Sequence, residues 1–492
     1  MPPAPLVPAV VARKLDAVSG PSGWLRLVGG LHQRRGFFWL DSAQVGARLG
    51  RTSFAGAEPW AVSRVRGRRI ETQIHRAREA APPPQAEGDA LDAVRALLPP
   101  RLAAATRLPV PFAGGVVAVV GYEAGDVWED LPPAPFETDR LPDATLLAVD
   151  RVYAYDHLEG VAWALALEVA ETAAGAQRRA EEAAQRMLSP LPQGAAPPCP
   201  AADRPAPIGG AGGTAAGPDA AGHAKAVQQI LDGIAAGDLY QACLTHRISV
   251  PFRGDPWCAY GALRRSNPAP FAAYLALPDA TLVGSSPERF LQITPGGWLE
   301  SRPIKGTRPR GADAERDRAL RAELDASAKD RAENVMIVDL VRNDLGRVAE
   351  PGSVHVPEWF HIEPHPAVFQ GVSTVCARLG PGRDALDEVK ACFPPGSMTG
   401  APKLAAMSLL RALEPTRRGP YAGALGYFDV RGSADLSVVI RTAIVRNGRA
   451  DVHTGGGIVA DSDAAEEWRE AATKARALLD ALAAAEGTVP RP

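Results

Sequence analysis

Short hydrophobic runs alternate with turn-forming residues in the first third of the chain, a pattern that predicts β-strands. The clearest runs cover residues 36–40, 114–122 and 144–155. A stretch at 177–188 carries hydrophobic side chains at helical spacing instead, so we expect an amphipathic helix there. This part of the chain is therefore rich in strands and ends in a helix.

The second half begins with a helical pattern over residues 224–236, which Gly237 is placed to end, and continues with a strand-like run at 239–247. Two further helical patterns lie within 314–343, and a long helix rich in Ala, Glu, Lys and Leu is predicted at 464–484. The sequence has no internal repeat of fixed period. Long strands followed by helices, rather than a strict strand–helix alternation, favour the α+β class.

Residues 189–221 differ in composition from both neighbouring regions, because they are almost entirely Ala, Pro and Gly. Such a segment buries too little hydrophobic surface to offset the entropy of ordering it, so we interpret it as a flexible linker or surface excursion. It divides the chain into an amino-terminal region, residues 1–188, and a carboxy-terminal region, residues 222–486.

The composition is ordinary for a globular protein. Of the 492 residues, 46% are hydrophobic and 22% are charged, and the formal net charge is −2. That balance argues against nucleic acid or an anionic membrane as a partner, and no hydrophobic run approaches the roughly 20 residues that span a bilayer. The amino terminus lacks the plan of a signal peptide. Five cysteines without Cys-x-x-Cys spacing argue against a disulfide framework or a zinc site, so we expect a cytoplasmic protein.

The most informative single residue is Lys305, which lies between a strand-like run and a glycine in Pro303-Ile304-Lys305-Gly306-Thr307. A lysine amine that is held away from water can act as a nucleophile. For an isolated Lys-Gly pair, a solvated lysine in a turn is the simpler interpretation. The motifs on either side of the lysine change that balance.

Four motifs accompany Lys305 along the chain: Ser285–Phe290 (SSPERF), Glu333–Asp344 (ENVMIVDLVRND), Gly396–Lys403 (GSMTGAPK) and Gly455–Asp461 (GGGIVAD). In this order they resemble the chorismate-utilising enzymes, the family of anthranilate synthase component I, over residues 222–485. The resemblance implies large antiparallel sheets packed face to face with helices outside. Residue patterning alone does not give that topology.

Two pairs of carboxylates stand three residues apart on predicted helices, Asp330 with Glu333 and Glu467 with Glu470. By spacing alone each pair is typical of a solvated helix face, and Glu470 also stands four residues before Lys474. The resemblance implies instead that Glu333 and Glu470 bind a magnesium ion directly, while Asp330 and Glu467 act through water. Magnesium prefers hard oxygen ligands and retains waters, and the ion would bridge to a carboxylate of the substrate.

Chorismate carries two carboxylates, so a second anion site is needed. Arg441 can form the bidentate pair that a carboxylate prefers. The glycine run 455–457 lets backbone N–H groups approach an anion, although such a run more often marks a bulge or a hairpin. Three further candidates for substrate contact have simpler interpretations by residue type alone: Ser397 as a turn serine, Tyr421 as a tyrosine at the edge of the core and Lys474 as a lysine on a helix surface. The substrate contacts that the resemblance implies are Ser397, Tyr421, Arg441, Gly456, Gly457 and Lys474.

Glu288 is the candidate proton-transfer group. Beside Arg289 it could be half of a structural ion pair. The resemblance places it near the C4 hydroxyl of chorismate, where a positioned acid would help that group to depart.

Two positions separate the branches of the family, and a third departs from the family pattern. Lys305 stands where anthranilate synthases have alanine, and it resembles the branch that aminates chorismate at C4, in which the lysine attacks C2. Gln241 stands where isochorismate and salicylate synthases place a water-activating lysine, which argues against water as the nucleophile. Gln370 departs from the histidine of many members, and because glutamine cannot shuttle a proton it weakens an anthranilate-type interpretation, which needs elimination of pyruvate.

These correspondences imply conversion of chorismate and ammonia to 4-amino-4-deoxychorismate, on the way to para-aminobenzoate and folate. No Gly-x-Cys-x-Gly motif is present and no appended glutaminase fits after residue 486, so the resemblance implies a glutamine amidotransferase subunit as the source of ammonia. Two alternatives stay open, an anthranilate synthase component I and a non-catalytic chorismate-binding subunit. The run Leu40-Asp41-Ser42 matches the tryptophan-site region of anthranilate synthases too briefly to carry that function over.

Overall fold

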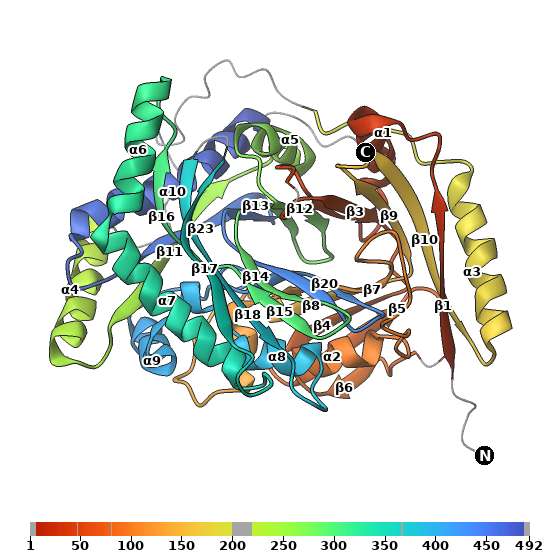
Figure 1. The fold of residues 1–492 in the computed structure, drawn as a ribbon, viewed down its shortest axis with the longest axis horizontal. Helices are drawn as coiled ribbons and strands as arrows, with labels where there is room; N and C mark the ends of the chain where they lie inside the picture. Colours follow the sequence, from red (N-terminus) through yellow and green to blue (C-terminus); the bar gives the residue numbers. More distant parts are fainter. Residues whose placement is uncertain (1–5, 47, 80, 199–218, 366–367, 487–492) are drawn as a thin grey trace.

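The computed structural model describes residues 6–46, 48–79, 81–198, 219–365 and 368–486. Two large antiparallel sheets pack face to face, and helices cover their outer faces (Figure 1). The fold expected from the family resemblance, α+β with face-to-face antiparallel sheets, is therefore confirmed. Among the described residues, no helix is both long enough and hydrophobic enough to cross a membrane.

Each sheet is built from strands that are far apart in the sequence. In spatial order, the first sheet contains β1 (Val7–Lys14), β10 (Val161–Ala170), β9 (Arg151–Asp156), β3 (Thr52–Gly56), β2 (Phe38–Asp41), β12 (Phe271–Ala276), β13 (Thr281–Ser286), β22 (Thr442–Arg446), β23 (Arg449–Ile458), β11 (Gln241–Pro251) and β19 (Gly400–Ala401). The second contains β16 (Ile304–Pro309), β18 (Val368–Arg378), β15 (Trp298–Ser301), β14 (Arg289–Ile293), β21 (Ala434–Val438), β20 (Ala424–Asp429), β7 (Gly115–Val120), β8 (Ala144–Val149), β4 (Ala61–Arg66), β5 (Arg69–Ile74) and β6 (Gln85–Glu87), while β17 (His355–Pro364) pairs with β18.

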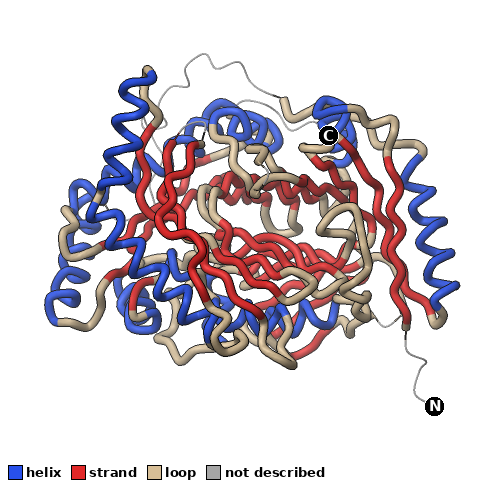
Figure 2. Tube along the Cα trace, in the orientation of Figure 1, coloured by secondary structure: helices blue, strands red, loops and turns tan. Residues whose placement is uncertain are grey.

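The α-helices lie outside this pair of sheets (Figure 2). They are α1 (Gly20–Leu31), α2 (Ala90–Leu97), α3 (Ala173–Leu188), α4 (Ala220–Ala236), α5 (Pro256–Ser266), α6 (Ala314–Ala326), α7 (Ala328–Gly346), α8 (Ala385–Cys392), α9 (Lys403–Leu413) and α10 (Ala464–Ala485). Between the sheets lies a buried core that includes Phe38 and Phe54 of the first sheet and Tyr427 of the second. The Phe54 and Tyr427 rings meet edge to face at 5.6 Å, so aromatic packing joins the two layers.

The amino-terminal and carboxy-terminal regions share both sheets. In the first sheet β2 pairs with β12, with Leu40 opposite Ala273. In the second sheet β7 pairs with β20, with Val117 opposite Tyr427. The composition break at 189–221 therefore divides the chain in sequence but does not divide the sheets.

One predicted strand is two strands in the structure. The run 144–155 forms β8 in the second sheet and β9 in the first, and the chain crosses between the sheets at Asp150. Asp150 is 1% exposed, and its carboxylate pairs with Arg76 and, at 2.8 Å, with Arg78. A buried carboxylate needs such partners, and those partners come from a distant loop that a local pattern does not reveal.

Only part of the predicted linker can be compared with the structure, because residues 199–218 lie outside the described residues. Before them, the Gly194 N–H donates a hydrogen bond to the Arg26 carbonyl at 2.9 Å, so this part of the segment lies against α1. After them, α4 begins at Ala220, earlier than predicted, because the Asp219 carboxylate caps the helix by accepting from the Gly222 N–H at 2.8 Å.

Candidate functional site

Lys305 lies on β16, the edge strand of the second sheet, at a break in its pairing with β18. Gly306 follows it with a φ of +82°, and a Cβ there would lie within 3.0 Å of Leu324 and Asp330. Only glycine fits this left-handed backbone under the two helices α6 and α7. The break in register lets the lysine reach α7, where its Nζ lies 3.5 Å from the Glu333 Oε2.

The amine of Lys305 crosses to the first sheet. A Cβ at Gly457 on β23 would lie 2.9 Å from the Lys305 Nζ, so the absence of a side chain at 457 gives the amine its space. Gln241 on the neighbouring strand β11 reaches the same point, with its side-chain carbon and oxygen 3.6 and 3.7 Å from that position. Its side chain is fully buried, and neither polar atom has a hydrogen-bond partner among the described residues. The site therefore lies where the edge strand β16 meets β11 and β23.

Glu288 lies in the turn between β13 and β14 and is 6% exposed. Burial raises the pKa of the Glu288 carboxyl to about 7, against the opposing effects of a Ser397 hydrogen bond, the charge of Lys305 and the Ile304 N–H. A carboxyl group with that pKa holds a proton near neutral pH and can deliver it to a leaving group. The structure thus brings Glu288, Ser397 and Lys305 together.

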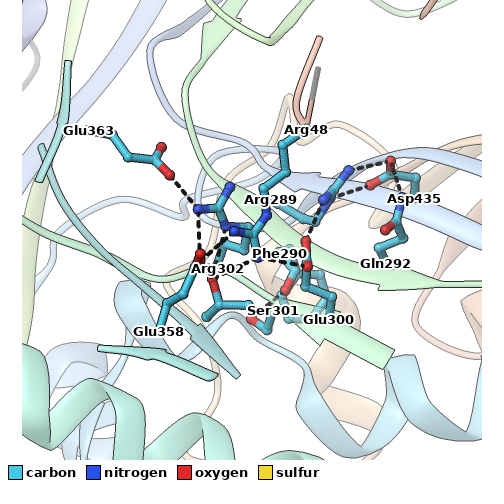
Figure 3. A network of polar contacts seen from close by, with 11 residues as sticks. Arg48, Arg289, Phe290, Gln292, Glu300, Ser301, Arg302, Glu358, Glu363 and Asp435 are labelled. Carbon is cyan, nitrogen blue, oxygen red and sulfur yellow. Dashed lines mark hydrogen bonds and ion pairs between the residues drawn. The ribbon is translucent and has the colours of Figure 1, made fainter. Parts of the chain in front are cut away.

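A network of ion pairs connects the strand that follows Glu288 in the sequence to its neighbours (Figure 3). Arg289, its neighbour in sequence, donates to both oxygens of Asp435 at 3.0 Å and to Glu300 at 2.6 Å. Arg302, which lies three residues before Lys305, is 2% exposed and pairs with Glu363. Because Arg289 has these partners, it is not the ion-pair partner of Glu288, and the Glu288 carboxylate stays free to act in the site.

Arg441 precedes β22 with a φ of +50°, a left-handed backbone that is uncommon for arginine. Burial lowers the pKa of its guanidinium, opposed by the nearby Tyr421 and Glu470. Among the described residues it has no ion pair and no side-chain hydrogen bond. Tyr421 is held beside it by stacking on His453, with the rings 5.1 Å apart. An unpaired guanidinium in such a position can bind a carboxylate.

Helix α10 contributes three of the predicted residues. Lys474 donates to the Gly455 carbonyl at 2.9 Å and pairs with Glu470 at 2.6 Å, as their spacing predicts. Burial raises the pKa of Glu470, but Lys474, together with the charges of Lys305 and Lys329, leaves that pKa below its usual value. Glu467 accepts a hydrogen bond from Ser462 at 2.7 Å and lies against Gly456, where a Cβ would be 2.9 Å from its carboxylate.

The remaining predicted residue, Asp330, is already engaged. Its carboxylate pairs with Arg308 at 3.1 Å, a partner on β16 that the sequence comparison did not single out. Arg308 follows Lys305 by only three residues in the sequence, although no pattern there pointed to its pairing with Asp330. Gln370 lies on β18 opposite Thr307, and its side-chain oxygen is buried without a partner among the described residues.

A model of the chorismate binding enzyme family matches residues 48–480. The chain belongs to this family. It is 42% identical over 463 residues to the aminodeoxychorismate synthase of Streptomyces pristinaespiralis, covering 90% of this chain and 61% of that protein. It is 39% identical over 494 residues to anthranilate synthase component 1 of Mycolicibacterium smegmatis, covering 98% and 91%.

A solved structure supports the assignment of the chain to this family. The crystal structure of anthranilate synthase component I from Streptococcus pneumoniae matches with a TM-score of 0.72 and 29% identity, covering 87% of this chain and 92% of that one. The chain spans about three fifths of the length of two Streptomyces aminodeoxychorismate synthases that it matches, 61% and 60%.

The magnesium ion that the sequence resemblance implies would be held directly by Glu333 and Glu470. Burial raises the pKa of Glu467, and Glu470 on the next turn of α10 adds to the increase, so the two carboxylates repel each other where a cation would separate them. No group of three or more His, Cys, Asp or Glu side chains gathers as a metal cage in the described part of the chain. Magnesium is commonly held by one or two carboxylates together with water and an anionic substrate, and Glu333 with Glu470 can supply that set.

One cavity of the structure lies away from Lys305. Its volume is about 500 Å³, and its lining includes Asp41, Ser42, Arg289 and Asp435 but not Lys305. Asp41 already accepts from Tyr260 at 2.9 Å and from Arg264 at 2.6 Å. The cavity shares Arg289, Gln292 and Asp435 with the network of Figure 3.

Proposed function

We propose that this chain is the chorismate-converting component of an aminodeoxychorismate synthase. One observation carries the proposal: the Lys305 amine lies against Gly457 and beside Glu333, near enough to Glu288 for its charge to lower the pKa of that carboxyl. An alanine at 305 would leave no nucleophile there. The similarity to the Streptomyces aminodeoxychorismate synthases supports the same branch.

In the first half of the reaction, the Lys305 amine attacks C2 of chorismate and forms a C2–N bond. The two ring double bonds shift, and the C4–O bond breaks. Glu288 delivers its proton to the departing hydroxyl, which leaves as water. The buried carboxyl is suited to this step because burial raises the pKa of Glu288 to about 7.

In the second half, ammonia attacks C4. The double bonds return to their first positions, the C2–N bond to Lys305 breaks, and the proton lost by the incoming nitrogen goes back to Glu288. Two substitutions replace one difficult displacement of hydroxide, which is the advantage of a covalent intermediate.

Binding of the two carboxylates of chorismate fixes the ring for these steps. Arg441 holds one of them through its free guanidinium, with Tyr421 beside it. The backbone at Gly456 and Gly457, which carries no side chain, is the expected further contact, next to the Glu467 carboxylate and the Lys305 amine. Glu333 and Glu470 would hold magnesium, assisted by Asp330 and Glu467. When bound, that ion neutralises the other carboxylate and orients the ring.

The ammonia comes from a separate glutamine amidotransferase subunit in this proposal. Releasing ammonia from glutamine requires a cysteine thiolate. Burial raises the pKa of the thiols of Cys243, Cys376 and Cys392, which keeps them protonated. None of these three is suited to that chemistry.

Anthranilate synthase component I is the second candidate, because its relatives are nearly as similar in sequence as the aminodeoxychorismate synthases. Product analysis with chorismate, ammonium and magnesium separates the two. We expect a product that needs a lyase to become para-aminobenzoate. A fluorescent anthranilate product would assign the chain to the other branch, and no product at all would indicate a binding subunit.

A further inference from the structure

Lys403 is a buried cation that the proposed mechanism does not use. It begins α9 and is 11% exposed, and its ammonium pairs with Asp344 of α7 at 2.6 Å. The same group donates to the carbonyls of Cys392 at 2.9 Å and Pro394 at 3.0 Å. All three hydrogens of the ammonium therefore have acceptors, as a buried charge requires.

The two carbonyls belong to the segment that leads into the 3-10 turn Gly396–Met398, which carries Ser397. Gly396 packs tightly on α7, where an added Cβ would lie 2.9 Å from Leu340 and 3.9 Å from the Asp344 carboxylate. Lys403 thus ties this turn to the helix that also carries Glu333. Three separate elements, α7, α9 and the turn, meet at one ammonium group.

The other end of the turn touches the proposed acid. The Ser397 hydroxyl lies close enough to the Glu288 carboxylate to lower the pKa of that carboxyl as a hydrogen-bond donor. Glu288, Ser397 and Asp344 line a common cavity of about 20 Å³, room for about one water. Asp344, the partner of Lys403, therefore borders the same cavity as Ser397 and Glu288, and a displacement of the turn would move Ser397 relative to Glu288.

We propose that Lys403, held by Asp344, is a positioning residue for chorismate conversion: it fixes residues 394–397 so that Ser397 stays hydrogen-bonded to Glu288. This role rests on the proposed function, in which Glu288 protonates the leaving hydroxyl. Without Lys403 the turn loses its anchor, Ser397 moves away, and the Glu288 proton is no longer aimed at the C4 oxygen. Lys403 acts through Ser397 and does not touch the substrate.

A double-mutant cycle tests this dependence. Lys403→Met, Ser397→Ala and the double variant are compared with the full chain, by chorismate consumption with saturating ammonium and magnesium. A displacement of about 1 Å can cost about 100-fold in rate, so each single variant should lose roughly that much. If Lys403 acts through Ser397, the double variant should lose no more than Ser397→Ala alone, because residues in one chain of contacts are not additive.

The pH profile of kcat/KM for chorismate is the second measurement. The Ser397 hydrogen bond opposes the effect of burial on the pKa of Glu288. Its loss should move the falling limb of the profile to higher pH, equally in Lys403→Met and in Ser397→Ala. Lys403→Arg should restore part of the rate and the original limb. Lys390→Met, on the exposed face of neighbouring α8, is the matched control and should change neither.

If removal of the ammonium alone prevents folding, Asp344→Asn combined with Lys403→Met removes both charges and takes the place of the single variant. Losses that multiply in the double variant, a pH limb that stays in place, or wild-type rates in Lys403→Met would overturn the positioning role. The assay follows the consumption of chorismate and not the identity of the product. The positioning role of Lys403 is therefore tested even if the chain makes anthranilate. A wild-type chain that consumed no chorismate would overturn the proposed function, and this inference with it.

Discussion

The Nζ of Lys305 lies 3.5 Å from the Oε2 of Glu333, so the proposed nucleophile is paired with a proposed magnesium ligand. Both side chains are largely buried, at 13% and 14% exposed, and Lys305 comes from the second sheet while Glu333 comes from α7. The pair would join the two functions of the site, because binding of magnesium by Glu333 would free the amine of Lys305.

We expect Glu333→Ala and Glu470→Ala to lose nearly all turnover while the chain stays folded, because each removes a hard oxygen ligand for magnesium. Activity is measured across a magnesium titration, with thermal unfolding as the test of folding. Glu466→Ala is the control, since the Glu466 side chain lies on the same helix as Glu470, α10, but is 69% exposed. Near-wild-type activity of either variant at low magnesium would show that the metal assignment is wrong.

The second prediction concerns pH. Because burial raises the pKa of Glu288 to about 7, its carboxyl carries a proton below that pH and loses it above. At a fixed concentration of free ammonia, kcat/KM for chorismate should fall as the pH rises through about 7. Glu288→Gln cannot transfer a proton, so it should lose about 10²- to 10⁴-fold and show no such limb. An unchanged limb in this variant would assign the titration to another group, and the exposed Glu315→Gln on α6 controls for the substitution.

Arg441 should act mainly on substrate binding. A hydrogen bond to a charged group contributes about 1.5–3 kcal/mol, so Arg441→Gln should raise the KM for chorismate by about ten- to one-hundredfold. The measurement is steady-state kinetics with ammonium, and Arg469→Gln, which is 71% exposed on α10, should behave as the wild type. If the KM of Arg441→Gln stayed at the wild-type value, the free guanidinium would not be the carboxylate site.

The purified chain should use ammonium but not glutamine. Burial keeps the described thiols of Cys243, Cys376 and Cys392 protonated, so they cannot start glutamine hydrolysis. Chorismate consumption is compared with ammonium and with ammonium-free glutamine as the nitrogen source. Steady turnover with glutamine alone would remove the need for a partner subunit.

The sequence predicted much of this arrangement, but unevenly. The pattern over 314–343 indicated two helices, and α6 and α7 are found there, because hydrophobic spacing and the caps at Asp313 and Ser327 are local signals. The run 144–155 was predicted as one strand and is two, since the crossing at Asp150 depends on arginines 72 or more residues away.

The candidate site shows the same limit. Motif order placed Lys305, Glu288 and the helix carboxylates in one site, and the structure brings them together. Which groups pair was not readable from the sequence: Arg308 with Asp330, and Arg289 with Asp435 rather than with Glu288, are contacts between strands and helices distant in the chain. Such pairings depend on how the two sheets pack, which no local pattern encodes.

The central claim is that Lys305 forms a bond to chorismate, and peptide mass spectrometry tests it most directly. Enzyme is mixed with chorismate and magnesium without ammonia, denatured and digested. We predict a mass increase on the peptide that contains Lys305, its disappearance in Lys305→Ala, and little activity in Lys305→Arg, because a guanidinium stays protonated and is a poor nucleophile. A fully active Lys305→Arg with no adduct on the wild-type peptide would contradict covalent catalysis and leave the lysine a purely electrostatic role.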